Sequence, residues 1–166
     1  MALVKEGVLG IVFRNNRSEA LLLKRRDAGI FVIPGGGIDE NESPEEAVIR
    51  ELEEETSCPV KIVRKIAKYT PINRLTKTTH FYECELTEEK SPQTGPEAVE
   101  VGFFPLTALP KPLFYIHHDF IQDATAPLSD CIVKSLSQVT YLNFFIYIFK
   151  HPLQFFRFFL SRFSKE

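Results

Sequence analysis

The alternation of hydrophobic and polar positions along this 166-residue chain predicts both strands and helices. Helices are predicted over 44–56, where Ser43, Pro44 and Glu46 form a capping pattern, and over 116–126. Short apolar runs bounded by Gly, Pro, Asn or Ser predict strands over 7–13, 20–23, 30–33, 60–67, 78–86 and 99–104. The pattern therefore favours an α+β domain with mainly antiparallel strands.

The chain changes character after residue 126. Residues 1–126 carry 15 Lys+Arg and 20 Asp+Glu, whereas residues 127–166 carry 5 and 2. Eight Phe and two Tyr fall between residues 141 and 163, beside a narrow polar stripe, and predict a hydrophobic helix that Pro152 bends or restarts. We therefore expect a domain over 1–126 and a basic, Phe-rich helical extension over 127–166.

The partner of this extension stays open on sequence grounds. Lys150 lies near the middle of the apolar stretch and opposes a transmembrane span. Residues 139–163 can instead pack on the domain, form a homodimer interface, or lie on a membrane surface with their basic side chains toward anionic headgroups. In these three alternatives the apolar face is covered by the domain, by a second copy of the chain, or by lipid.

Composition excludes several classes of function. A net charge of −2 argues against duplex nucleic acid as a partner held by bulk positive charge. The three cysteines form no CxxC pair, so neither a disulfide framework nor a thiolate zinc site is expected. The charged N-terminus does not resemble a secretory signal. We expect a cytoplasmic protein, peripheral to a membrane if the extension binds lipid.

The strongest chemical signal lies on the helix predicted over 44–56. Glu51, Glu54 and Glu55 share one face of that helix, at spacings where like charges repel. Between residues 39 and 55 there are nine acidic residues and one basic residue, a concentration of hard oxygen ligands that suits Mg²⁺ or Mn²⁺. A solvated glutamate-rich helix is the alternative, but the glycine-rich loop just before it favours a site.

Residues 36–58 resemble the Nudix box, G-x5-E-x7-R-E-U-x-E-E-x-G-U, where U is aliphatic. The matching positions are Gly36, Glu42, Arg50, Glu51, Leu52, Glu54 and Glu55. The final glycine is replaced by Ser57 and the last aliphatic residue by Cys58, so we expect slightly altered geometry where the helix ends. The resemblance covers about residues 4–126. It implies the Nudix fold, an α/β/α sandwich of mixed or antiparallel sheets flanked by helices, followed here by a C-terminal hydrophobic helical extension.

The resemblance also implies an activity on acid anhydrides of phosphorus. Nudix hydrolases use Mg²⁺ or Mn²⁺ to cleave the pyrophosphate bond of a nucleoside diphosphate linked to another moiety. Carried over by motif position, the metal ligands are Glu54, Glu55 and the backbone carbonyl of Gly35, and Glu51 either joins them or acts as general base. Glu97 is the best positional match for a further catalytic base or ligand, ahead of Glu100.

Other residues receive supporting roles. Gly36, Glu42 and Arg50 resemble the structural part of the box, in which the Glu42–Arg50 ion pair fixes the loop against the helix. Arg25 and Arg26, next to Lys24 at a strand end, are candidates to bind substrate phosphate. His117 and His118 are interpreted as surface residues of a helix.

A Nudix-fold module that binds a nucleotide without hydrolysing it is the rival hypothesis. The full set of acids favours the enzyme. The substrate is a nucleotide or nucleotide derivative whose identity the sequence leaves open.

Overall fold

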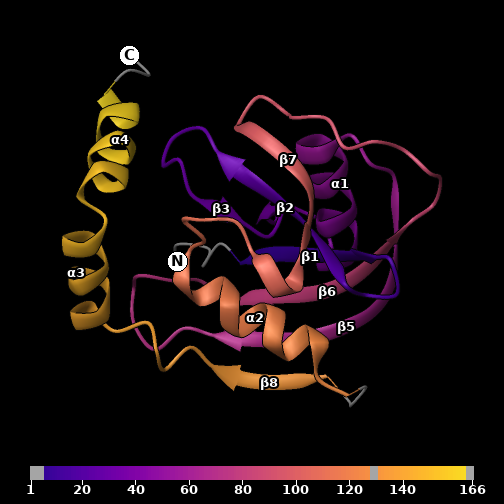
Figure 1. Cartoon of the computed structure of the whole chain (residues 1–166). Coiled ribbons are helices and arrows are strands. Elements are labelled where there is room, and N and C mark those ends of the chain that lie inside the picture. Colours follow the sequence, from indigo (N-terminus) through magenta and orange to yellow (C-terminus); the bar gives the residue numbers. More distant parts are fainter. Residues whose placement is uncertain (1–5, 128–130, 164–166) are drawn as a thin grey trace.

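The computed structural model describes residues 6–127 and 131–163 (Figure 1). The strands are β1 (Gly7–Arg14), β2 (Glu19–Arg25), β3 (Phe31–Val32), β4 (Gly35–Gly37), β5 (Val60–Thr70), β6 (Thr79–Leu86), β7 (Ala98–Pro105) and β8 (Ile132–Ser135). The helices are α1 (Pro44–Thr56), α2 (Tyr115–Thr125), α3 (Tyr141–Lys150) and α4 (Pro152–Phe163), with a 3₁₀ turn at Leu106–Ala108.

The strands form one mixed sheet in the order β3-β2-β1-β6-β5-β8, with β4 paired to β1 and β7 paired to β2. Most neighbours are antiparallel, as the sequence predicts. The pairs β1–β6 and β5–β8 are parallel. Parallel pairing joins segments far apart along the chain, and nothing in the local pattern indicates it.

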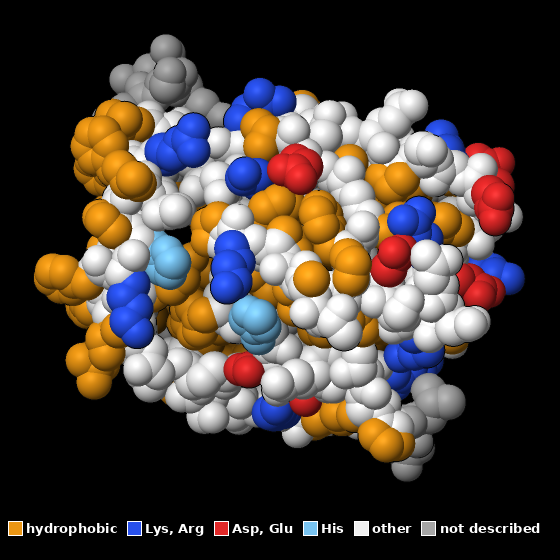
Figure 2. All heavy atoms as spheres, viewed as in Figure 1, with side chains coloured by type: hydrophobic (Ala, Val, Ile, Leu, Met, Phe, Trp, Pro, Cys, Tyr) orange, Lys and Arg blue, Asp and Glu red, His pale blue; other side chains and the backbone are white. Residues whose placement is uncertain are grey.

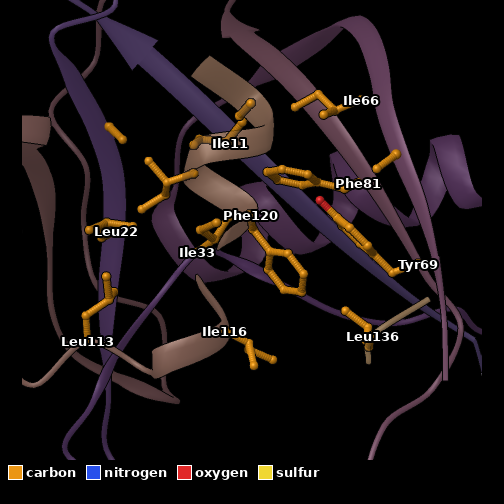
Figure 3. Packing of buried hydrophobic residues seen from close by; sticks show 14 of the residues in the cluster. Ile11, Leu22, Ile33, Ile66, Tyr69, Phe81, Leu113, Ile116, Phe120 and Leu136 are labelled. Atoms are coloured by element: carbon orange, nitrogen blue, oxygen red, sulfur yellow. The ribbon is translucent and has the colours of Figure 1, made fainter. Parts of the chain in front are cut away.

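Apolar side chains cover both faces of the sheet. On one face α1 packs Val48 and Leu52 into a cluster with Val8, Leu21 and Tyr82. On the other face lie Tyr69, Phe81 and Phe120 of α2, with the Tyr69 and Phe120 ring centroids 4.5 Å apart (Figure 3). The sheet is thus flanked by helices on both sides, which confirms the predicted sandwich.

Helix α1 has the predicted bounds because local signals define both of its ends. The Ser43 hydroxyl accepts from Glu46 N at 3.2 Å, and the Glu46 carboxylate accepts from Ser43 N at 2.9 Å. At the other end Ser57 adopts the left-handed conformation, φ 56° and ψ 21°, and donates its N–H to Glu53 O at 2.8 Å. The helix therefore ends as it would with glycine, and Ser57 accepts a steric cost of roughly 1 kcal/mol in the left-handed conformation.

Two strands were not predicted. Gly35–Gly37, expected as a turn, forms β4 and pairs with β1. In the extension, β8 pairs with β5, and Leu136 and Val139 just beyond it are buried in the core. The boundary after residue 126 stays a prediction from composition, because the chain beyond it contributes both a strand and core residues.

Helices α3 and α4 follow as two segments separated at His151, so Pro152 restarts the helix. The Tyr147 ring packs against Phe114 and Tyr115, with centroids 5.4 Å and 5.3 Å apart. Figure 2 shows hydrophobic side chains gathered at the edge of the molecule where these two helices lie. Among the described residues no helix has the length and apolarity to cross a bilayer.

Candidate active site

A cleft of about 380 Å³ opens between β4, the C-terminal half of α1 and the loop before β7. It gathers the predicted acids from two separate parts of the sequence. Its lining residues are Arg25, Gly35, Gly36, Gly37, Glu51, Glu54, Glu55, Gly95, Pro96, Glu97 and Ala98. The fold therefore brings every predicted metal-binding or catalytic residue to one hollow.

Glu55 is held against the glycine strand. Its Oε2 accepts a hydrogen bond from Gly35 N at 2.8 Å. Gly35 has φ 151°, and a Cβ there would collide with the Val8 carbonyl, so no larger residue fits. Burial raises the pKa of Glu55 to about 7 despite the Gly35 hydrogen bond, and the charges of Glu51 and Glu97 add to the rise.

Glu51 and Glu54 lie one helical turn apart and share a counter-charge. Arg50 Nη1 donates to Glu51 Oε1 at 3.0 Å and to Glu54 Oε2 at 3.4 Å. The Glu51 carboxylate lies over Gly36, where a Cβ would displace it. Burial raises the pKa of Glu51, although Arg50 opposes this rise. Two of the cleft's carboxylates thus have raised pKa values because they are removed from water.

Arg50 joins α1 to the loop after β4. Its Nε and Nη2 donate to the two carboxylate oxygens of Glu42 at 2.8 Å and 2.9 Å, and Nη2 also donates to Gly37 O at 3.0 Å. Glu42 accepts a further bond from Asp39 N at 3.0 Å. The Arg50 hydrogen bonds lower the pKa of Glu42 to about 2. The ion pair therefore holds the glycine loop against the acidic helix.

The loop before β7 reaches the site by covering the C-terminal end of α1. Gln93 N donates to Thr56 O at 2.8 Å and Gly95 N to Glu55 O at 3.1 Å, which pairs carbonyls that the helix leaves open. A Cβ on Gly95 would lie 2.5 Å from Glu54 O, so this approach needs glycine. The contact places Glu97 beside Glu55 in the cleft.

The two predicted phosphate-binding arginines have different surroundings. Arg25 lines the cleft, and its Nε and Nη2 donate to the carboxylate of Asp27 at 2.9 Å and 2.7 Å. Arg26 turns to the loop before β7, where it donates to Pro96 O and Ala98 O, both at 3.0 Å. The structure brings Arg25 but not Arg26 to the cleft, and Arg26 instead braces the loop that carries Glu97.

Two lesser candidates also lie outside the cleft lining. The Lys24 ammonium lies over the Phe31 ring, 5.3 Å from its centroid. Glu100 pairs with Lys24 across β2 and β7 and is exposed. Asp27, which orients Arg25, was missed by the sequence analysis, and an acid two residues after an arginine is too common a pattern to signal it.

His117 corrects another expectation. The sequence analysis placed it on a surface, but its side chain is buried in α2, while the neighbouring His118 is exposed. His117 Nδ1 accepts a hydrogen bond from Ile33 N at 2.9 Å. Burial lowers the pKa of His117 to about 3, so the ring is neutral at pH 7. Because Ile33 precedes Pro34 and Gly35, this bond fixes the backbone that enters the site.

Replacing His117 with glutamine is expected to reduce the loss of unfolding free energy that the protein undergoes between pH 6.5 and pH 5. The folded pKa lies below the unfolded value near 6.5, so the unfolded chain binds more protons as the pH falls below 6.5. The native protein should lose roughly 2 kcal/mol of unfolding free energy from this group between pH 6.5 and pH 5. Urea unfolding at pH 6.5 and at pH 5 measures this loss of unfolding free energy. His118→Gln is the matched control, and equal pH slopes in both variants would contradict the assignment.

The cleft fits a hard divalent cation by its chemistry. Carboxylates of Glu51, Glu54 and Glu55 and the backbone of Gly35 line one hollow, and they are the ligand types that Mg²⁺ and Mn²⁺ prefer. Within the described residues, no three Asp, Glu, His or Cys side chains already converge at ligating distances. The Arg50 guanidinium donates to Glu51 and Glu54 in this arrangement.

Comparisons with known proteins agree on one family. A model described as the NUDIX domain matches residues 5–124. The ADP-ribose pyrophosphatase of Methanocaldococcus jannaschii is 33% identical over 122 residues, which are 69% of this chain and 69% of that protein. A putative 8-oxo-dGTP diphosphatase of Bacillus subtilis is 30% identical over 106 residues, which are 61% and 70%. The crystal structure of an ADP-ribose pyrophosphatase from Streptococcus suis aligns with a TM-score of 0.65 and 25% identity, covering 78% of this chain and 98% of that one.

Proposed function

The chain belongs to the NUDIX family of hydrolases, and from this premise we propose that it hydrolyses the pyrophosphate bond of a nucleoside diphosphate joined to another group, using Mg²⁺ or Mn²⁺. The observation that carries the proposal is the convergence of Glu51, Glu54, Glu55 and Glu97 with the Gly35 backbone in one cleft. A solvated glutamate helix would leave all of these acids exposed, whereas Glu51 and Glu55 are partly buried.

We assign each of these groups a role in the hydrolysis. Glu54, Glu55 and the Gly35 carbonyl hold the metal, which when bound neutralises phosphate charge and lowers the pKa of a water. Glu51 or Glu97 takes the proton from the attacking water, since both line the same hollow. Asp27 engages Nε and Nη2 of Arg25, so Nη1 is the atom that we assign to substrate phosphate.

A substrate panel tests the proposal. ADP-ribose, 8-oxo-dGTP, nucleotide sugars, nucleoside triphosphates and dinucleoside polyphosphates are offered with Mg²⁺ or Mn²⁺, and released phosphate and pyrophosphate are measured. The two relatives named above suggest that ADP-ribose and an oxidised nucleotide come first in the panel. We expect metal-dependent release from at least one substrate. Nucleotide binding without any product would instead support the rival, a Nudix-fold binding or regulatory module that does not hydrolyse the nucleotide.

The outer face of α3 and α4 is proposed to rest on an anionic membrane surface. Leu142, Phe145, Phe149, Leu153 and Phe156 are all more than half exposed. From residue 131 to residue 163 the chain contains no Asp or Glu, while it contains four Lys or Arg. An apolar face on a segment that carries positive but no negative charges suits an anionic lipid layer, where each basic residue near the surface adds about 1 kcal/mol.

Flotation with vesicles checks this contact. The full chain should float with vesicles that contain phosphatidylserine and far less with pure phosphatidylcholine, because the basic residues supply part of the attraction. The double variant Phe149→Glu, Phe156→Glu should lose at least tenfold in vesicle binding. A chain that stays in the lower fractions, yet elutes as a dimer that the same variant splits, would favour the homodimer instead.

A further inference from the structure

A second cavity lies beside the catalytic cleft, between the domain and the two C-terminal helices. It has a volume of about 450 Å³, within the range of small-molecule pockets. The domain side is lined by Leu9, Arg25, Ala28, Ile30, Val32, Ile33, Gly35, Leu75, Phe114 and His117, and the helix side by Phe144, Tyr147, Ile148, His151, Gln154, Phe155 and Phe158. Arg25 and Gly35 also line the catalytic cleft, so the two hollows adjoin.

The residues that line the cavity favour a neutral aromatic ring over a charged group as the ligand. Seven of the lining side chains carry rings, none is a carboxylate, and the one Lys or Arg side chain, Arg25, is shared with the catalytic cleft, where it is assigned to phosphate. Aromatic side chains bind planar bases by stacking on their faces. Phosphate groups, by contrast, would pair with the divalent cation that the carboxylates of the adjoining cleft are proposed to hold.

Polar groups at the cavity indicate a ring with a hydrogen-bonding edge. Tyr147 Oη is buried and has no hydrogen-bond partner among the residues described. This hydroxyl has almost no accessible surface, so a ligand in the cavity would contact the Tyr147 ring and not its Oη. Gln154 adds an amide to the same wall, and His151 lies with its ring centroid 4.5 Å from that of Tyr147. A nucleobase offers flat faces to the rings and polar edge atoms to the Gln154 amide, whereas an alkyl chain offers neither.

We propose that this cavity binds the base of the substrate nucleotide and that α3 and α4, which lie outside the matched family region at residues 5–124, form its specificity-determining wall. The proposal rests on the proposed function, since it places the base in one hollow and the diphosphate in the next. Helix α4 lies close to the domain at this point, since a Cβ built on Gly29, before β3, would lie 3.0 Å from Arg157 Nη1.

Two adjacent pairs of phenylalanines supply a matched test. Phe144 and Phe155 line the cavity, whereas their neighbours Phe145 and Phe156 do not and are more than half exposed. Phe144→Ala with Phe155→Ala should raise KM for the nucleotide substrate about 5- to 100-fold, the usual range for lost base stacking, with little change in kcat. In assays without vesicles, Phe145→Ala with Phe156→Ala should leave KM unchanged, because neither side chain lines the cavity. An abasic analogue of the same substrate should show no difference between the two double variants.

Equal KM values for wild type and both phenylalanine double variants would overturn the proposal. So would a dodecyl diphosphate that is cleaved in preference to nucleotides and depends on the same phenylalanines.

A binding experiment separates failure of this inference from failure of the proposed function. Adenosine, guanosine, cytidine and uridine are added to the full chain without metal, and saturation-transfer NMR reports contact. At least one nucleoside should bind wild type and the Phe145→Ala, Phe156→Ala variant, but not the Phe144→Ala, Phe155→Ala variant. Such selective binding would support the base pocket even if the protein hydrolysed no diphosphate. Equal transfer in both variants, or none in wild type, would overturn the base pocket while leaving hydrolysis intact.

Discussion

Glu55→Gln is expected to lower metal-dependent hydrolysis about 1000-fold, because it removes a proposed metal ligand that no neighbour can replace. A bound metal contributes several kcal/mol to stabilising the transition state, and each 1.36 kcal/mol corresponds to a tenfold change in rate. Glutamine has nearly the same size and can still accept the hydrogen bond from Gly35 N. The measurement is kcat at saturating Mg²⁺ on the best substrate of the panel.

The same substitution should stabilise the metal-free protein at pH 8. A carboxylate buried near Glu51 and Glu97 is unfavourable, as its raised pKa indicates, and a neutral amide avoids that cost. Thermal melting without metal should therefore show a higher midpoint for the variant. Added Mg²⁺ should raise the midpoint of the wild type much more than that of the variant, because only the wild type retains the full ligand set.

Glu53→Gln is the matched control for both measurements. Glu53 lies on α1 between these acids but is exposed and absent from the cleft lining. Its substitution should leave kcat within about twofold, as is usual for surface positions away from a site. Equal losses in Glu53→Gln and Glu55→Gln, or a Glu55→Gln enzyme with full activity, would contradict the assigned ligand.

The elements that could be predicted are those with local signals. Helix α1 was placed to the residue because Ser43, Pro44 and Glu46 mark its start and Cys58-Pro59 marks its end. The acids of the site were found because three of them share that helix face. Glu97 is more distant, and only the family resemblance pointed to it. Its position depends on a loop that covers the end of α1 by contacts no local pattern predicts.

The rest depends on contacts between distant segments. Strand β8 joins β5 across more than 60 residues, and β4 exists only because a glycine segment lies against β1. His117 was placed on a surface because a helical pattern with two adjacent histidines does not show which one faces the core. The contribution of α3 and α4 to the second cavity could not be predicted either. The sequence of an aromatic-rich helix shows that it has an apolar face, but not which part of the protein that face contacts.

Arg50→Lys and Glu42→Gln are each expected to reduce activity about 10- to 100-fold, the range seen when groups that orient metal ligands are removed. Lysine keeps the charge but cannot donate to both Glu42 oxygens, Gly37 O and two further carboxylates at once. Glutamine at position 42 frees the arginine from its strongest partner. In either variant the glycine loop loses its tie to α1, so the Gly35 carbonyl and Glu55 no longer hold their relative positions.

The double variant Arg50→Lys, Glu42→Gln tests whether the two losses of activity have the same cause. If the ion pair acts as a unit, Arg50→Lys with Glu42→Gln should be only slightly less active than either single variant, with a coupling energy of about 1 to 3 kcal/mol. Independent roles would make the losses multiply. Asp39→Asn is the control, since Asp39 lies 3.8 Å from the same arginine but is 79% exposed, and its loss should have little effect. Additive losses, or an Asp39→Asn effect as large as that of Glu42→Gln, would contradict the view that the Arg50–Glu42 ion pair acts as a unit that fixes the loop to the helix.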